Sequence, residues 1–213
     1  MKRPMITLTL LLATAVAAVA QDSARYTVTF HGTWSAETHP DDFPLLAHFS
    51  PLIGVTHDGS FDVATVGKTA TNGLEKLSEE GKHQPFDAEI KKALDTGAAG
   101  TLIETMEPIR DLPGMSETTF SIDAKHPMVS IVAMIAPSPD WFAGAIGVTL
   151  REGDGWVSER TVNLEAYDAG TDSATTYRAL DADMDPRGRI QPNASPYFAG
   201  DRRVVGTLTF KRK

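Results

Sequence analysis

The sequence predicts an all-β fold, an antiparallel β-sandwich with short helices. After Thr118, runs of β-branched and aromatic residues alternate with clusters of Pro, Gly and Asp, a pattern typical of short strands joined by turns. The first and last strand candidates alternate apolar and polar residues, as half-buried strands do. A length of 213 residues, with 41% hydrophobic and 23% charged residues, fits one globular domain with a full core.

The N-terminal segment is typical of a secretory signal peptide. Lys2 and Arg3 precede an almost wholly apolar run from Met5 to Ala20, which ends in the small residues that signal peptidase prefers. A membrane anchor is the alternative, but this run is shorter than the roughly 20 residues that a spanning helix needs. We therefore expect a signal peptide over residues 1–20, cleaved before Gln21, and a secreted or periplasmic protein with no membrane span after cleavage.

The predicted domain, residues 24–213, begins with a strand and continues with two short helices. Alternating apolar residues predict a strand over Arg25–His31, and the turn-rich stretch Glu37–Pro51 predicts no regular structure. Apolar residues at helical spacing predict a helix over Thr71–Glu80, which Gly81 can terminate. A second helix is expected over Phe86–Leu94.

The remainder of the chain predicts strands. The runs are Thr119–Ile122, Met128–Ile135, Ala143–Leu150, Trp156–Leu164 and Val204–Phe210. We find no internal repeat and no linker, so the sequence predicts one domain.

Composition excludes several classes of function. A formal net charge of -8 disfavours non-specific binding to nucleic acid or to anionic membranes, which both require a basic face. The absence of cysteine excludes disulfides, zinc–thiolate sites, iron–sulfur clusters and a thiol nucleophile.

Two acidic loops are the main candidate site. Asp140 follows one strand candidate, and Asp168 and Asp172 follow another, with Gly170 between them to permit a sharp turn. Loops at one end of a sandwich cluster in space, and three converging carboxylates would repel one another unless a cation lay among them. Oxygen ligands without His or Cys favour calcium, which takes roughly 6 to 8 oxygens. The alternative is that these aspartates only cap turn amides.

Other candidate sites are weaker. The stretch from Asp181 begins like an EF-hand loop, but Pro186 and Pro192 stand where Gly and Glu are required, so a solvated acidic loop is the better interpretation. Four histidines are spaced eight or nine residues apart, which matches no compact metal motif and favours packing and loop hydrogen bonds, with a zinc site using two of them left open: His31, His39, His48 and His57. No GxSxG elbow supports a hydrolase triad.

The same loops carry a family resemblance. The sequence has "FHGTWS" within Tyr26–Ser35, "THPDDFP" at 38–44, "HFSPLIGVTH" at 48–57, "PSPDWFAGAIGVTL" at 137–150, "GW" at 155–156 and "YDAGTDS" at 167–173. Together, in this order, these pieces resemble the spondin N-terminal domain of F-spondin and mindin, which is also found in bacterial exported proteins.

The resemblance implies a C2-like antiparallel β-sandwich with a Ca²⁺ ion held by loop aspartates, matched here by Asp140, Asp168 and Asp172. The animal relatives act in matrix adhesion and cell-surface recognition, a role that does not transfer automatically with the fold. Unlike them, this sequence has no cysteines and no reeler or thrombospondin repeats. We therefore expect a free-standing, bacterial-type exported member, and the resemblance gives little support for integrin binding.

The sequence thus predicts an exported calcium-binding module that recognises a protein or glycan partner and is not an enzyme. A metal-dependent hydrolase that uses the same acidic end is the alternative, and it would need a general base or an open metal position in a cleft. Purely structural calcium, with the partner bound elsewhere, is a third possibility.

Overall fold

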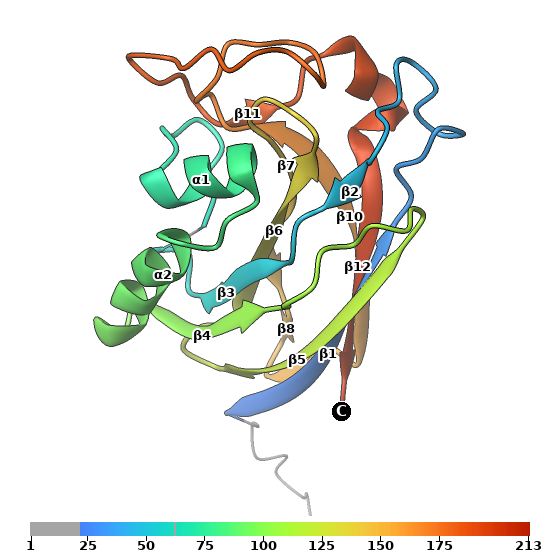
Figure 1. The fold of residues 1–213 in the computed structure, drawn as a ribbon. Helices are drawn as coiled ribbons and strands as arrows, with labels where there is room; N and C mark the ends of the chain where they lie inside the picture. The colour runs from blue at the N-terminus through green and yellow to red at the C-terminus, as the bar shows by residue number, and fades with distance from the viewer. Residues whose placement is uncertain (1–21, 62) are drawn as a thin grey trace, which may run out of the picture.

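The computed structural model describes residues 22–61 and 63–213 (Figure 1). The predicted signal peptide lies outside these described residues, so its cleavage stays a prediction. Within the described part of the chain, no helix is long and apolar enough to cross a membrane.

The described chain is mostly β-strand, with two α-helices early in the chain. The strands are β1 (Ser23–Gly32), β2 (His48–Phe49), β3 (Ile53–His57), β4 (Ala99–Glu104), β5 (Met115–Asp123), β6 (Met128–Ala136), β7 (Trp141–Thr149), β8 (Arg151–Glu152), β9 (Gly155–Trp156), β10 (Glu159–Asp168), β11 (Gln191–Pro192) and β12 (Val204–Arg212). The helices are α1 (Asn72–Glu80), α2 (Phe86–Asp95) and the 3₁₀ turns η1 (Pro196–Phe198) and η2 (Gly200–Arg203).

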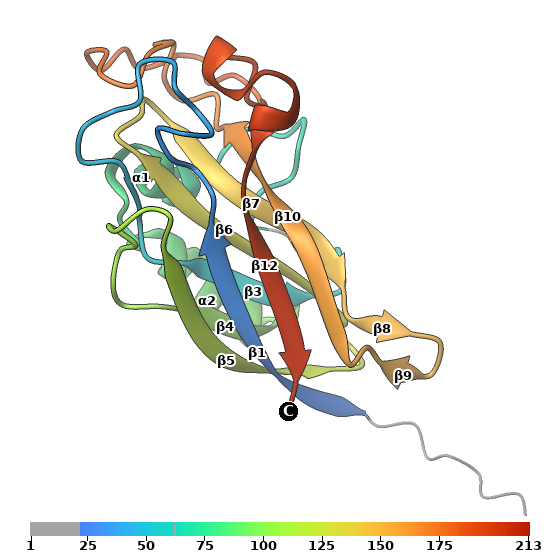
Figure 2. The same ribbon diagram turned by 90° about the vertical axis from the view of Figure 1, so that its right-hand side faces the viewer.

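One large antiparallel sheet forms the body of the protein. Its strand order is β4-β3-β6-β7-β10-β12-β1-β5, with β11 added to β10 and β2 to β6. The sheet folds over on itself, so that its end strands β4 and β5 lie against each other and the two halves enclose a core (Figure 2). The predicted all-β fold with short helices is confirmed.

The larger core lies between the two halves of the sheet. In β1 the side chains of Tyr26, Val28 and Phe30 alternate with polar ones and are fully buried, as the sequence pattern predicts. They pack with inward-facing residues of β6, β7, β10 and β12 in one cluster, which includes Trp141 and Phe210.

The two helices cover the outer face of β3 and β6 and form a second core with them (Figure 1). Thr71 caps α1 by accepting the N–H of Leu74 at 3.1 Å, and Gly81 ends it at φ 67°. Gly73 lets α1 approach α2 closely, because a Cβ at this position would lie 2.5 Å from the Cα of Phe86.

Several details of the prediction were wrong or incomplete. The stretch Glu37–Pro51 was expected to have no regular structure, but it contains the two-residue strand β2, which pairs with β6. The strand expected over Trp156–Leu164 is two elements, because Trp156 belongs to the β8–β9 hairpin and β10 begins at Glu159. The strands β3 and β4 were not predicted. Both β3 and β4 are short, and β3 is buried at every residue, so neither has the alternating pattern by which a half-buried strand is detected.

The first and last long strands are neighbours. β1 and β12 pair antiparallel along their length, with Tyr26 opposite Arg212. The start of β1 and the end of β12 therefore lie at the same end of the sheet, opposite the long loops that follow β10 (Figure 1).

Candidate functional site

The strand register brings the two acidic loops together. Trp141 in β7 pairs with Asp168 in β10. Asp140, which precedes Trp141, therefore adjoins the segment that follows Asp168, and the N–H of Ala169 donates to the backbone carbonyl of Asp140 at 3.2 Å. Both loops lie at the end of the sheet shown uppermost in Figure 1.

Asp140 is the most buried of the predicted ligands, with 0% of its surface exposed. Its Oδ2 accepts the backbone N–H groups of Thr171 at 2.8 Å and Asp172 at 3.2 Å, and it lies 3.4 Å from the Thr171 hydroxyl. Its Oδ1 is also buried and has no hydrogen-bond partner in the protein. A buried carboxylate oxygen without a partner is costly, so contact with an ion or an ordered water would stabilise this atom.

Asp168 and Asp172 lie on the loop that Asp140 holds. Asp168 Oδ1 accepts the N–H of Gly170 at 2.8 Å. Asp172 is 5% exposed, and its two oxygens accept the N–H groups of Ala174 at 2.6 Å and Ala182 at 2.8 Å. These bonds shape the loop as turn-capping aspartates do, and they leave further lone pairs on each oxygen.

The segment 184–188 is hydrogen-bonded to this loop. Gly188 donates its N–H to the carbonyl of Gly170 at 2.7 Å, and Met184 donates to Thr171 at 2.8 Å. Gly170 has φ +72°, and a Cβ there would lie 2.8 Å from the carbonyl carbon of Gly188. Glycine is therefore required for both the turn and the close approach.

The carboxylates are electrostatically unfavourable without a counterion. Burial, reinforced by the negative charge of Asp168, raises the pKa of Asp140 to about 7. Burial also raises the pKa of Asp168, with a further contribution from the charge of Asp172. A cation near these groups would favour their charged forms and remove this cost.

The donor set fits a hard cation, although the side chains do not form a closed cluster of ligands. Within residues 22–61 and 63–213, no three His, Asp or Glu side chains are grouped so that they hold a metal ion as they stand. The unpartnered Oδ1 of Asp140 and the raised pKa values of Asp140 and Asp168 are the observations that match a cation. An ion here would be held by Asp140 and Asp168, whereas both oxygens of Asp172 already accept backbone amides of the loop.

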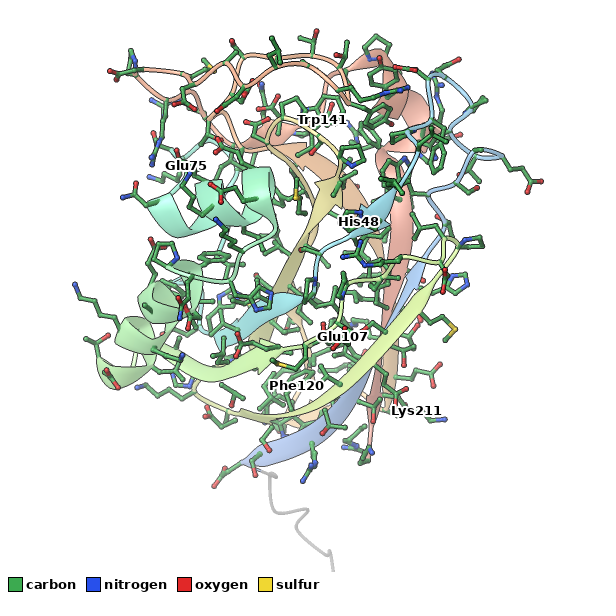
Figure 3. The ribbon with its side chains drawn as sticks, viewed as in Figure 1. His48, Glu75, Glu107, Phe120, Trp141 and Lys211 are labelled. Carbon is green, nitrogen blue, oxygen red and sulfur yellow. The ribbon has the colours of Figure 1, made fainter. Side chains whose placement is uncertain are left out.

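Aromatic side chains support the site from below. Trp141, which is 1% exposed, lies under the loops (Figure 3). Its ring packs against those of Tyr177 at 5.4 Å and Phe198 at 5.5 Å between centroids. Asp140 therefore precedes a residue that is fixed in the core, which limits how far its carboxylate can move.

The sequence analysis missed other residues of this region. Thr171 binds Asp140 through its amide, a contact that depends on the fold and leaves no sequence signal. Asn193 is 3% exposed, and together with Ser195, Trp141 and Asp168 it lines a hollow of about 230 Å³. A neighbouring hollow of about 320 Å³ is also lined by Asp168 and includes Asp172.

Three of the four histidines make separate local hydrogen bonds, and the fourth is exposed. His39 Nε2 bonds the carbonyl of Arg202 at 2.6 Å, His48 Nδ1 bonds that of Leu46 at 2.8 Å, and His57 Nε2 bonds Ser130 Oγ at 2.9 Å. His31 lies exposed on β1. The packing and hydrogen-bonding interpretation fits these contacts, and none of the four joins a metal cluster in the described part of the chain.

Comparison with known proteins agrees with the resemblance seen in the sequence. The family described as Spondin_N matches residues 24–203. Spondin-2 of Homo sapiens is 32% identical over 167 residues, which cover 74% of this chain and 49% of Spondin-2. Spondin-1 of Gallus gallus is 32% identical over 207 residues, which cover 89% of this chain and 25% of Spondin-1. The chain thus spans about half the length of the first relative and a quarter of the second.

Proposed function

This chain belongs to the Spondin_N family, and from that starting point we propose that it is an exported, calcium-binding recognition module without catalytic activity. Calcium orders the loops 137–142 and 167–173, and the ordered loops form a surface for a protein or glycan partner outside the cytoplasm.

The observation that carries this proposal is the environment of Asp140. Its carboxylate is completely buried, one oxygen is unpartnered, and a second carboxylate, Asp168, lies close enough to raise its pKa. Buried polar atoms in native proteins nearly always have a partner, so the free oxygen supports a ligand at this position. A cation bound to Oδ1 would give this oxygen a partner and would offset the repulsion between the Asp140 and Asp168 carboxylates.

Calcium is the cation that best fits the ligands and the compartment. All candidate side-chain ligands are carboxylates, and the chain has no cysteine. Hard oxygen ligands on flexible loops suit calcium better than magnesium, which demands near-octahedral geometry, or zinc, which prefers nitrogen and sulfur. The expected export would place the protein where calcium is abundant.

No described feature favours the hydrolase alternative. A catalytic metal keeps an open coordination position in a cleft, next to a general base. Asp140 is instead closed beneath its loops, and Asp172 is tied by two amides.

A calcium titration by calorimetry, beside thermal melts of EDTA-treated protein, tests the proposal. If the site binds at about 10 μM, then about 1 mM calcium stabilises the fold by about 2.7 kcal/mol, a clear upward shift in melting temperature. The Asp168→Asn variant should lose this response, and Asp154→Asn, a change in the exposed β8–β9 turn, should keep it. Absence of calcium binding in the unaltered protein would reduce the acidic loops to turn caps and leave only the family and the fold.

A further inference from the structure

Positive side chains gather at the end of the sheet where β1 begins and β12 ends. The N–H of Lys213 donates to the carbonyl of Arg25 at 2.9 Å, which places these two residues side by side. Arg160 of β10 pairs with Phe210 of β12, directly before the last residues of that strand. We call this group the basic cluster, and its members are Arg25, Arg160, Lys211, Arg212 and Lys213.

The side chains of the basic cluster bond neutral oxygens. Arg25 donates to the hydroxyl of Thr119 at 3.3 Å. Arg212 donates to the carbonyl of Trp156 at 3.1 Å, and Arg160 also donates to a backbone carbonyl. Within residues 22–61 and 63–213 no member forms an ion pair, whereas other arginines do so, namely Arg178, Arg187, Arg202 and Arg203.

One carboxylate lies close to the cluster by strand register. Glu159 is opposite Lys211 in the β10–β12 ladder, and both side chains are exposed. An exposed pair of this kind contributes little and leaves the other four cations without a counterion. Like charges held together repel one another, so an anionic partner would lower the electrostatic energy of this end of the protein.

The acidic loops do not cancel this local charge. Figure 3 shows Lys211 and Trp141 at opposite ends of the sheet, and Asp140 precedes Trp141. The ten residues of β1 span about 30 Å, whereas charges are screened over about 8 Å at physiological salt. Although the whole chain has a formal charge of -8, a partner at this end therefore meets a basic face.

The cations surround the end of the sheet and do not follow a line. Successive side chains of a strand point to opposite faces, so Lys211 and Arg212 lie on different faces of β12. Arg25 is exposed on β1, where the alternate positions are buried, and Arg160 is on the side of β10 that carries the core residue Leu164. A linear polyanion would reach one face only. A flat anionic surface that meets the strands end-on would contact both faces.

The order of the chain brings this end to a membrane. The apolar run of the expected signal peptide precedes β1, and β1 begins at the basic cluster. During export this end of the domain is therefore the part nearest the lipid headgroups. Anionic headgroups attract basic residues placed beside a membrane, so they are the partner that fits both the charge and the position.

We propose that the basic cluster docks the domain on an anionic lipid bilayer, with the strands end-on to the membrane. This surface is separate from the candidate calcium site and goes beyond the proposed function. Each Lys or Arg beside an anionic bilayer strengthens binding by a factor of about five, so five of them give a partition constant of about 10³ M⁻¹. Binding of this kind is reversible and sensitive to salt.

The test is co-sedimentation of the exported protein with lipid vesicles in EDTA, which prevents calcium from bridging the acidic loops to the lipid. One set of vesicles contains phosphatidylcholine with about one third phosphatidylglycerol, and the other contains phosphatidylcholine alone. In about 0.05 M salt the protein should bind the anionic vesicles at least about tenfold more strongly than the neutral ones. About 0.5 M salt, which shortens the screening length to about 4 Å, should abolish the difference.

Paired variants locate the binding surface. Lys211→Gln with Lys213→Gln removes two exposed charges, so it should fold normally and weaken binding to anionic vesicles about 25-fold. Lys68→Gln with Lys82→Gln changes the net charge equally, at exposed positions next to β11 and after α1, and should change binding less than about twofold. Thermal melts of both variants check that they are folded.

Each outcome decides the inference. Binding that the cluster variant loses and the control variant keeps supports it. Equal binding to neutral vesicles, no vesicle binding, or full binding by the cluster variant would overturn it. Retention on heparin that depends on Lys211 and Lys213, without vesicle binding, would overturn it in favour of a linear polyanion. Because every arm is free of calcium, failure here leaves the calcium proposal standing, and failure of calcium binding leaves this inference standing.

Discussion

Asp140 Oδ2 accepts the N–H of Thr171 over 2.8 Å, although these residues are 31 positions apart in the chain. This bond joins the loop before β7 to the loop after β10. Because Oδ1 of the same carboxylate is buried without a partner, one side chain both fastens the loops and offers a ligand atom. The predictions below separate these two contributions.

Replacing Asp140 by Asn should stabilise the calcium-free protein, and calcium should offset that gain. At pH 8 in EDTA the variant removes a buried charge and keeps one oxygen for the amides, so the free energy of unfolding should rise by about 1 to 3 kcal/mol. With about 1 mM calcium this advantage of the variant should shrink by about 2.7 kcal/mol, because only the unaltered protein gains stability from an ion bound at about 10 μM. Chemical denaturation in both buffers measures these stabilities. A loss of stability of the variant in EDTA would mean that the carboxylate serves only to bind the loop amides.

The calcium-free protein should lose stability as pH rises from about 4 to 7. The folded pKa of Asp140, about 7, exceeds its ordinary value of 3.8, so in this window the folded state binds a proton that the unfolded state has released. Stability therefore falls with increasing pH, by up to about 4 kcal/mol from this group, and the raised pKa of Asp168 acts in the same direction.

Denaturation in EDTA between pH 5 and 8 tests this dependence. The contribution of Asp140 is the difference in the free energy of unfolding between the unaltered protein and Asp140→Asn at each pH. The contributions of the other carboxylates are common to both proteins and cancel. Calcium should flatten the curve, since it favours the ionised form. Equal slopes for the two proteins would contradict the assigned pKa.

Gly170→Ala should loosen the acidic loop and leave the core folded. The residue has φ +72°, and its new Cβ would approach the Gly188 carbonyl carbon to 2.8 Å, so we expect a loss of about 1 to 3 kcal/mol and weaker calcium binding. Gly153→Ala is a matched control, because Gly153 also has a positive φ but has nothing within 4 Å. Equal calcium affinity in both variants would show that the loop geometry does not matter for the ion.

Ser130→Ala should destabilise the sheet without affecting calcium. Ser130 Oγ accepts the N–H of Gly147 at 2.8 Å and lies 2.9 Å from His57 Nε2, and all of its surface is buried. Loss of these bonds should cost about 1 to 3 kcal/mol in thermal or chemical denaturation, whereas the exposed Ser121→Ala should stay within about 0.5 kcal/mol. A shift in calcium affinity for Ser130→Ala would mean that the two ends of the sheet are coupled.

Local sequence patterns predicted the parts of the fold that depend on local forces. Alternation located β1 and β12, and Gly81 marked the end of α1 because a C-terminal cap acts within one helical turn. The fully buried β3 carried no such pattern, since all five of its residues are buried and no exposed polar position alternates with them. The sheet order could not be read from the sequence, because it is decided by pairing between distant strands.

The sequence predicted which acidic residues form the candidate site, but it did not predict the contacts that these residues make. Asp140, Asp168 and Asp172 were identified as acids in turns that follow strands. Their arrangement depends on the register of Trp141 with Asp168, and the position of the buried Asn193 depends on the return of the chain at β11. Contacts of this kind become visible only in three dimensions.

The pairing of β1 with β12 also determines how the domain is oriented on anything to which it is attached. Tyr26 and Arg212 are opposite one another, at the end of the sheet away from Asp140. A linker attached to the start of β1 or to the end of β12 therefore joins the domain at the end of the sheet opposite the acidic loops, which then point away from the attachment. Surface immobilisation through the C-terminus should leave the loops accessible to a glycan or a protein in solution.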